Sequence, residues 1–210
     1  MRPVLITTGA TRNPIDSMRY ISAHASGRTG AWLAEKLQSA TDVHVLCSPE
    51  ASQRLSDSVS QEIFGSTDDL MKRMEQWLNA HPNSVTIHSA AVGDYALAAE
   101  AEDKKIASGQ DSLTLTLKPT PKILDHIQLW ANQGYIVSFK AASPDTSMKD
   151  LETIARAQAI RSKSALVFAN IIGKTDGEVM LVDEHGHMPF SNRIDGLQAL
   201  YERVLSMCTY

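Results

Sequence analysis

Short, continuously apolar runs alternate along the chain with longer segments in which apolar residues recur at helical spacing. The apolar runs predict β-strands at residues 4–8, 43–47, 85–90, 135–140 and 165–170. The longer segments predict helices at residues 29–39, 68–80, 122–131 and 148–161. Strands that are apolar on both sides need a cover on both faces. The alternation therefore predicts an α/β fold, a doubly wound, mostly parallel, Rossmann-like sheet with helices on both faces.

The remaining segments complete the prediction of a single domain that spans residues 1–210. Residues 48–60 are polar and predict a loop or a weak helix, and residues 62–65 predict a short edge strand. Leucines alternate with polar residues over 112–118, which predicts a half-exposed antiparallel strand acting as a small β flap. Two apolar runs, 179–182 and 187–190, predict a β-hairpin, and residues 195–207 predict a closing amphipathic helix.

The first predicted strand leads into an unusual connection. It breaks at Gly9 and continues as a long polar loop, which delivers Ser26-Gly27-Arg28-Thr29-Gly30 to the start of the first helix. The first amide groups of a helix lack internal partners and carry the positive end of its dipole, so they can bind an anion. Ser26 is a candidate cap there. An ordinary capped strand–helix unit is the alternative, but a loop of this length favours a functional role.

Composition narrows the possible functions. The chain has 210 residues, of which 43% are hydrophobic and 21% charged, and a formal net charge of −4. The negative charge and scattered basic residues argue against a nucleic-acid partner, and no apolar run approaches the roughly 20 residues of a membrane span. Two cysteines, Cys47 and Cys208, are too few for a disulfide framework or a structural zinc site. We therefore expect a cytoplasmic protein without a membrane partner.

Candidate chemistry gathers where the parallel strands end, because ligands bind there in open α/β sheets. Ala90 and Ala91 are small residues at a strand end, so a flat ring could approach the backbone, although they could equally pack against a helix. Asp94 could bind a ribose, a base or a metal ion, or could cap the next turn. Phe139 could stack on a base or belong to the core. His185-Gly186-His187 falls on a hairpin turn, where we expect exposed side chains and no metal site.

Several motifs occur in order along most of the chain. They are Thr8-Gly9-Ala10-Thr11-Arg12, Ile15-Asp16, Met18-Arg19-Tyr20-Ile21, Ser26-Gly27-Arg28-Thr29-Gly30, Ala90-Ala91-Val92-Gly93-Asp94-Tyr95, Lys105-Ile106-Ala107-Ser108, Thr120-Pro121-Lys122-Ile123-Leu124, Ser138-Phe139-Lys140 and Phe168-Ala169-Asn170. Together they resemble phosphopantothenoylcysteine synthetase, also called phosphopantothenate–cysteine ligase. The Lys-Ile-Ala-Ser segment is more similar to the standalone variants than to fused bacterial members, which continue as Lys-Ile-Lys-Lys.

The resemblance implies a carbon–nitrogen ligase of coenzyme A biosynthesis. Such an enzyme activates the carboxylate of 4′-phosphopantothenate with CTP or ATP, and the cysteine amine then displaces the nucleotide. The resemblance also implies Mg²⁺ together with the nucleoside triphosphate, no tightly bound cofactor, small-molecule substrates and a homodimer.

Residue roles follow from the resemblance position by position. Lys105 is implied as a catalytic lysine that reaches the triphosphate, and Arg19, Ser26, Gly27 and Arg28 as substrate-binding residues. The implied nucleotide-binding residues are Gly9, Ala10, Thr11, Ser26, Gly27, Ala90, Ala91, Asp94, Lys105, Pro121, Lys122, Ile123, Leu124, Phe139 and Arg161. Gln158 and Ser162 stand where fused members carry lysines.

One residue departs from the family pattern at the implied catalytic site. Ala23 takes the place of an asparagine suited to orient the acyl carbonyl, and a methyl group cannot replace that polar contact. Loss of one such contact commonly costs on the order of 10²–10³ in rate. An introduced substitution, compensation by Ser22 or His24, and a paralogue with a different acid or amine all remain open.

Two other functional classes compete with the ligase. A nicotinamide-dependent oxidoreductase needs Gly-x-Gly-x-x-Gly after the first strand, where this chain has Gly9-Ala10-Thr11-Arg12. The Tyr and Lys four residues apart that short-chain reductases use are missing as well. A family member that binds nucleotide without turnover is the other alternative, and Ala23 keeps it open.

Overall fold

The computed structural model describes residues 1–99, 101, 104–109, 111–174 and 177–209. Among these residues, eight strands form the main sheet: β1 (Val4–Thr8), β4 (Val43–Cys47), β5 (Ser60–Ile63), β6 (Val85–His88), β9 (Tyr135–Ala142), β10 (Leu166–Ile171), β11 (Val179–Val182) and β12 (His187–Phe190). The helices are α1 (Arg28–Leu37), α2 (Pro49–Ser52), α3 (Thr67–Ala80), η1 (Ile123–Asp125), α4 (Ile127–Trp130), α5 (Met148–Ser162) and α6 (Arg193–Cys208).

The strand order is β12-β11-β10-β9-β6-β1-β4-β5. The six strands from β10 to β5 run parallel, whereas β11 and β12 are antiparallel to their neighbours. From β1 the chain moves outward to β4 and β5, and then returns to the other side of β1 at β6. This reversal creates a switch point between β1 and β6, the place where doubly wound folds bind ligands. The predicted fold class is confirmed.

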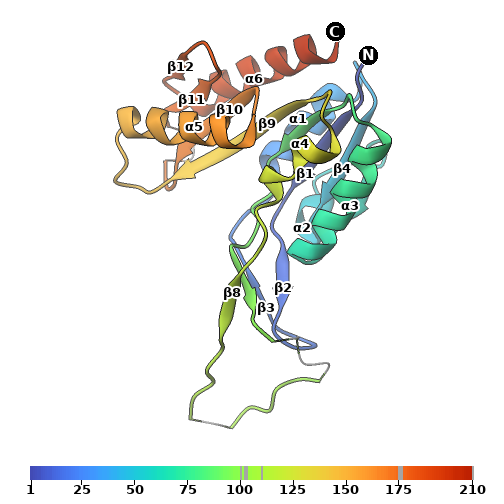
Figure 1. Cartoon of the computed structure of the whole chain (residues 1–210), viewed down its shortest axis with the longest axis vertical. Coiled ribbons are helices and arrows are strands. Elements are labelled where there is room, and N and C mark those ends of the chain that lie inside the picture. The colour runs from blue at the N-terminus through green and yellow to red at the C-terminus, as the bar shows by residue number, and fades with distance from the viewer. Residues whose placement is uncertain (100, 102–103, 110, 175–176, 210) are drawn as a thin grey trace.

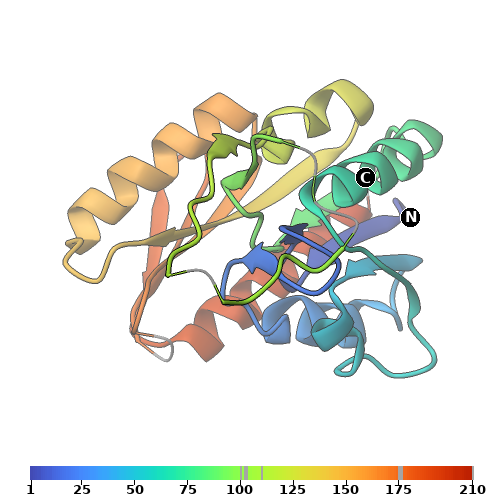
Figure 2. The ribbon, with the colours of Figure 1, turned by 90° about the horizontal axis from the view of Figure 1, so that it is seen from below.

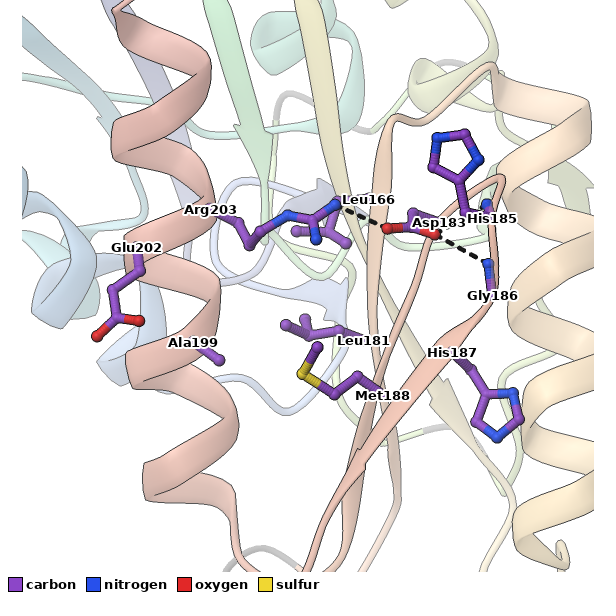
Figure 3. A pocket seen from close by; sticks show the side chains of 10 residues that line it. All are labelled: Leu166, Leu181, Asp183, His185, Gly186, His187, Met188, Ala199, Glu202 and Arg203. Carbon is purple, nitrogen blue, oxygen red and sulfur yellow. Dashed lines mark hydrogen bonds and ion pairs between the residues drawn. The ribbon is translucent and has the colours of Figure 1, made fainter.

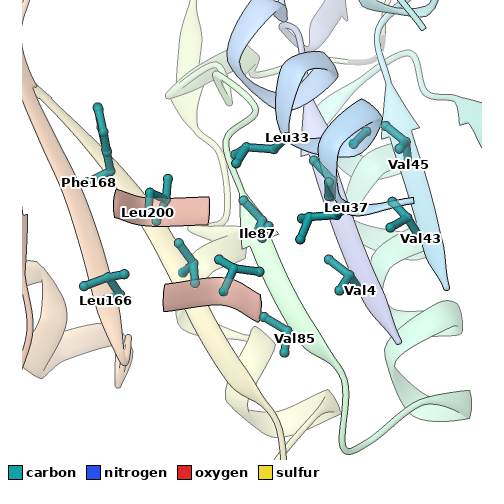
Figure 4. Close-up of a cluster of buried hydrophobic side chains, with 14 of the residues drawn as sticks. Val4, Leu33, Leu37, Val43, Val45, Val85, Ile87, Leu166, Phe168 and Leu200 are labelled. Atoms are coloured by element: carbon teal, nitrogen blue, oxygen red, sulfur yellow. The ribbon is translucent and has the colours of Figure 1, made fainter. Parts of the chain in front are cut away.

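Helices cover both faces of the sheet (Figure 1). On one face, Leu33 and Leu37 of α1 and Leu200 of α6 pack onto Val4 and Ile87 (Figure 4). The opposite face carries a second cluster, in which side chains of α3 and α4 pack against the sheet. Val4 and Ile6 enter the first cluster and Leu5 enters the second, which explains why consecutive positions of β1 are apolar. Fully burying one such side chain contributes about 1.5–3 kcal/mol.

Two short hairpins form an arm that projects from the sheet (Figures 1 and 2). One pairs β2 (Arg12–Pro14) with β3 (Tyr20–Ser22), and the other pairs β7 (Tyr95–Leu97) with β8 (Leu117–Pro119). The Asn13 side-chain amide donates to the Tyr95 carbonyl at 2.9 Å, which joins the two hairpins. The arm continues the carboxyl-terminal ends of β1 and β6, so it stands beside the switch point.

The structure corrects three details of the prediction. The strand expected at 112–118 is limited to Leu117–Pro119, because β7 offers it only three residues to pair with. The helix expected at 122–131 is a 3₁₀ turn followed by the four-residue α4. The connection after β1 is not only a loop, since it contains the β2–β3 hairpin.

Candidate functional site

A cavity of about 670 Å³ opens between the beginnings of α1 and α6. It is lined by Thr8, Gly9, His24, Ala25, Ser26, Gly27, Arg28, Thr29, Trp32, Ser89, Arg193, Ile194 and Leu197. In the part of the chain that the structure describes, the lining includes two arginines and no carboxylate, although the chain as a whole carries a net charge of −4. The cavity is therefore suited to an anionic ligand.

Helix α1 begins differently from the other long helices. Side chains of Ser66, Ser147 and Asn192 accept hydrogen bonds from first-turn amides of α3, α5 and α6. At α1 the capping residue is Gly27, not the expected Ser26, and no side chain caps the helix. Its first turn also contains no acidic residue. The positive end of the α1 dipole thus faces the cavity without a protein anion in that turn.

Two glycines allow the backbone to form the floor of this cavity. Gly9 and Gly27 have φ values of +88° and +74°, a region that favours glycine. A Cβ atom on Gly27 would lie 2.4 Å from the Ala51 Cβ, and one on Gly9 would lie 2.1 Å from the Ser48 Oγ. The Thr8 hydroxyl donates to the Gly27 carbonyl at 2.9 Å, which ties the end of β1 to the start of α1.

The backbone at the switch point joins the motif segments after β1 and β6. The Ala91 amide donates to the Gly9 carbonyl at 2.8 Å, and the Thr11 amide donates to the Ala91 carbonyl at 3.1 Å. Ala10 and Ala91 form an isolated parallel bridge between these bonds. Ala90 is half-buried beside them. The structure therefore brings together the predicted residues of these two segments.

A buried histidine, His88, stabilises the backbone between β1 and β6 through Thr7. His88 Nδ1 lies 2.8 Å from the Thr7 Oγ1, and the Ala90 amide donates to the same hydroxyl oxygen at 3.3 Å. Burial lowers the pKa of His88 to about 4. The ring is therefore neutral at physiological pH and acts as a structural support.

Arg19 is held by an ion pair on the arm. The buried Asp16 carboxylate accepts hydrogen bonds from Arg19 Nε at 2.9 Å and Nη2 at 2.5 Å. The Arg19 guanidinium holds the pKa of Asp16 well below its usual range. Asp16 also accepts from the Ile106 amide at 3.0 Å, while Arg19 donates to the Ile106 carbonyl at 2.8 Å. The ion pair thus holds the backbone at Ile106, next to Lys105. That Arg19 binds the substrate stays a prediction.

Lys105 is exposed on the arm, outside the residues that line the cavity. Of the predicted nucleotide-binding residues beyond the arm, Asp94 forms an ion pair with Lys122 at 2.5 Å, and Arg161 forms one with Asp125. Ile123 is buried in the cluster beneath α3, while Pro121 and the half-buried Leu124 flank it along the chain. These residues lie apart from the cavity lining, so the predicted nucleotide-binding set falls into two groups.

Phe139 lies on the cavity side of the sheet. Its ring centroid is 5.3 Å from that of Phe168, and the Arg193 guanidinium carbon lies 5.0 Å from the Phe168 ring centroid. The Gln158 side-chain amide donates to the Phe139 carbonyl at 3.2 Å and to the Ser138 hydroxyl at 3.0 Å. Gln158 therefore has a buried structural role here.

Ala23 is exposed after β3, whereas its neighbour His24 lines the cavity. Sequence reasoning missed Arg193, the second arginine of the lining. It lies two residues before the predicted start of the closing helix at residue 195. The sequence does contain a signal for a helix that starts at Arg193: Asn192 can cap such a helix, and Asp195 then stands at its third position.

A second cavity, of about 430 Å³, lies between α6 and the β11–β12 hairpin (Figure 3). His187 contacts Glu152 at 3.0 Å and the exposed His185 contacts Glu184 at 3.3 Å.

Within the described part of the chain, no cluster of three or more His, Cys, Asp or Glu residues is arranged to hold a metal ion. No helix in that part is long and apolar enough to cross a membrane.

Comparison with known proteins decides the family. A family model described as the DNA/pantothenate metabolism flavoprotein C-terminal domain matches residues 1–198. The chain belongs to this family. The bifunctional coenzyme A biosynthesis protein CoaBC of Thermococcus kodakarensis is 36% identical over 183 residues, which cover 85% of this chain and 44% of that protein. CoaBC of Escherichia coli strain K12 is 31% identical over 179 residues, which cover 81% and 41%. The chain thus spans less than half the length of these relatives.

Solved structures of similar proteins share the fold. The DNA/pantothenate metabolism flavoprotein of Streptococcus pneumoniae matches with a TM-score of 0.85 and 24% identity, over 98% of this chain and 99% of that one. A Cab2 mutant in complex with phosphopantothenate-cysteine matches with a TM-score of 0.77 and 19% identity, over 100% and 89%. Membership of the family confirms the resemblance that the sequence motifs indicated.

Proposed function

We propose that the chain ligates 4′-phosphopantothenate to L-cysteine through an acyl-nucleotide formed from CTP or ATP, a step of coenzyme A biosynthesis. The observation that carries the proposal is the cavity at the start of α1. It is built from residues 26–29 of the motif segment, it contains two arginines, and the described residues that line it include no carboxylate. The CoaBC relatives and the solved complex with phosphopantothenate-cysteine support the choice of substrates.

The reaction requires two displacements. A carboxylate oxygen of 4′-phosphopantothenate attacks the α-phosphorus of the nucleoside triphosphate, the bond to the β-phosphate oxygen breaks, and pyrophosphate leaves. The cysteine amine then attacks the acyl carbon and loses a proton. The acyl–oxygen bond breaks, and the nucleoside monophosphate leaves. Each displacement builds negative charge on phosphate oxygens or on the acyl oxygen, so fixed positive groups accelerate it.

We assign roles from the placement of each group. Gly27 and Arg28 contact phosphate at the first turn of α1, where both residues line the cavity. Lys105 serves the triphosphate from the arm. Its backbone neighbour Ile106 is held by two hydrogen bonds. Phe139 and Asp94 bind the base and ribose. A ribose hydroxyl that approaches Asp94 would compete with the ion pair to Lys122.

We expect Mg²⁺ to enter as the counterion of the triphosphate. Mg²⁺ prefers oxygen ligands and often binds through substrate phosphates and one or two carboxylates. It would offset charge on the leaving pyrophosphate. Chelation with EDTA should therefore stop pyrophosphate release, and added Mg²⁺ should restore it.

The decisive experiment measures pyrophosphate release with CTP and with ATP, in the presence and absence of 4′-phosphopantothenate and cysteine. Release that requires the acid, with amide formed only when cysteine is present, supports the ligase. Acyl-nucleotide without amide would support the alternative that Ala23 points to, an enzyme that uses another amine. Nucleotide binding seen by calorimetry without any release would support a binding subunit, and no binding of either nucleotide would refute the proposal.

We also propose a homodimer located in the cytoplasm. Met18, Tyr20, Tyr95, Leu113 and Leu117 expose large apolar side chains on the arm, and a second copy would cover them. A sedimentation mass near the 23.0 kDa of one chain at micromolar concentration would contradict the dimer. Both cysteines are free and buried, as suits a reducing compartment.

A further inference from the structure

The second arginine of the cavity comes from the far end of the chain. Arg193 is the first residue of α6, and its Nη2 donates to the Thr29 hydroxyl at 3.0 Å, inside the motif segment at the start of α1. Its guanidinium carbon lies 5.0 Å from the Phe168 ring centroid. The Thr29 bond and the aromatic face help to orient the arginine fork beside the cavity that Arg28 also lines.

The local charges at both helix starts are unusual. Cations in the first turn of a helix oppose its dipole, yet α1 and α6 each begin with an arginine. The acidic residue in the first turn of α6, Asp195, accepts a hydrogen bond from the Asn192 side chain at 2.7 Å, so this carboxylate is engaged at the cap. The uncapped start of α1 and two guanidinium groups therefore act on one cavity, and the described residues that line it include no carboxylate.

The size of the cavity points to a ligand with more than one phosphate. A volume of about 670 Å³ far exceeds one phosphate group, and two guanidinium forks from separate helices match phosphates that are joined but distinct. We propose that Arg193 and Arg28 together bind the β- and γ-phosphates of the nucleotide, the part that leaves as pyrophosphate. This inference rests on the proposed function and adds Arg193 as a residue that distinguishes a triphosphate from a monophosphate.

The test compares three ligands by titration calorimetry at fixed ionic strength: the nucleoside triphosphate, its monophosphate and inorganic pyrophosphate. For Arg193→Gln we expect affinity for triphosphate and pyrophosphate to fall by about ten- to hundredfold, because a charge-assisted hydrogen bond is lost. Affinity for the monophosphate should stay within about twofold. The matched control is Arg203→Gln on the same helix, whose guanidinium pairs with Asp183 outside this cavity, and it should leave all three affinities unchanged.

A purely structural role of Arg193 gives a different result. Thr29→Val removes the hydrogen bond to Arg193 but keeps the cation, so it should weaken pyrophosphate binding less than Arg193→Gln does. Arg193→Lys should recover part of the lost affinity, because the charge returns without the fork. Equal loss in Thr29→Val and Arg193→Gln, or equal loss for mono- and triphosphate, would overturn the inference.

The two proposals can fail separately. Wild-type protein that binds pyrophosphate in an Arg193-dependent manner but releases none from CTP or ATP would refute the ligase and retain the anion site. Wild-type protein that turns over nucleotide while Arg193→Gln retains its triphosphate and pyrophosphate affinities would refute only the role of Arg193. Wild-type protein that binds neither nucleotide nor pyrophosphate would overturn both.

Discussion

Replacement of His88 by glutamine should make the protein less sensitive to acid. His88 is buried and neutral, with a pKa of about 4 in the folded state, compared with about 6.5 in an unfolded chain. Below pH 6.5 the unfolded state therefore binds a proton that the folded state does not, and stability falls by about 1.4 kcal/mol per pH unit until pH 4. At pH 5 this single group should reduce the free energy of unfolding by about 2 kcal/mol relative to pH 8.

Thermal unfolding at pH 8 and pH 5 measures this effect. For a chain of this size, 2 kcal/mol corresponds to a fall in Tm of about 4–8 °C. Wild-type protein should lose that much more than His88→Gln between the two pH values, whatever the substitution costs at pH 8. His185→Gln is the matched control, because His185 is exposed. An equal loss in wild type and His88→Gln would refute the reasoning. Burial also lowers the pKa of His44, so the variant should keep a smaller acid response of the same sign.

Three further substitutions test the site. Ala23→Asn should raise cysteine-dependent amide formation more than acyl-nucleotide formation in a quenched-product assay; an equal or lower amide yield would show that Ala23 belongs to another chemistry. Lys105→Gln should leave the Tm of the free protein nearly unchanged and weaken nucleotide binding by about ten- to hundredfold, and Lys104→Gln should do much less; equal weakening by both would mean only diffuse surface charge. Gly27→Ala should cost at least about 1–2 kcal/mol in urea unfolding because of its positive φ, whereas Gly186→Ala, which has open space for a methyl group, should cost less; equal costs would argue against strain at Gly27.

The core of the fold could be predicted from the sequence because buried positions recur at the spacing of strands and helices and are occupied by apolar residues. The strands Val4–Thr8 and Val43–Cys47 and the hairpin strands Val179–Val182 and His187–Phe190 match their predicted ranges. In the first three of these strands nearly every residue is buried, because successive residues alternate between two covered faces. The last strand is at the sheet edge and is largely exposed. Of the strand predicted at 112–118, only the end forms, as the start of β8. Leu113 and Leu117 are exposed, so their alternation with polar residues does not reflect a buried face.

The sequence could predict only those cavity residues that lie close together in one motif. Gly9 and residues 26–29 line one cavity, because a strand, a glycine-bearing loop and a helix start lie close together in the chain. Arg193 joins them from more than 160 residues away through a bond to Thr29. The clamp of Asp16 on Ile106 also spans distant segments. Neither contact follows from periodicity or spacing, since each depends on how the helices and the arm pack.

The position of Trp32 in the cavity lining gives the protein a fluorescent reporter of its own. The other two tryptophans lie elsewhere: Trp77 stacks on His81, and Trp130 is buried on the opposite face of the sheet. Indole emission depends on the polarity and charge around the ring, so an anion that enters the cavity changes Trp32 and leaves the other two unaffected. In a protein with Trp77 and Trp130 replaced by phenylalanine, ligand arrival and pyrophosphate departure become separate optical signals that can be timed in a stopped-flow instrument.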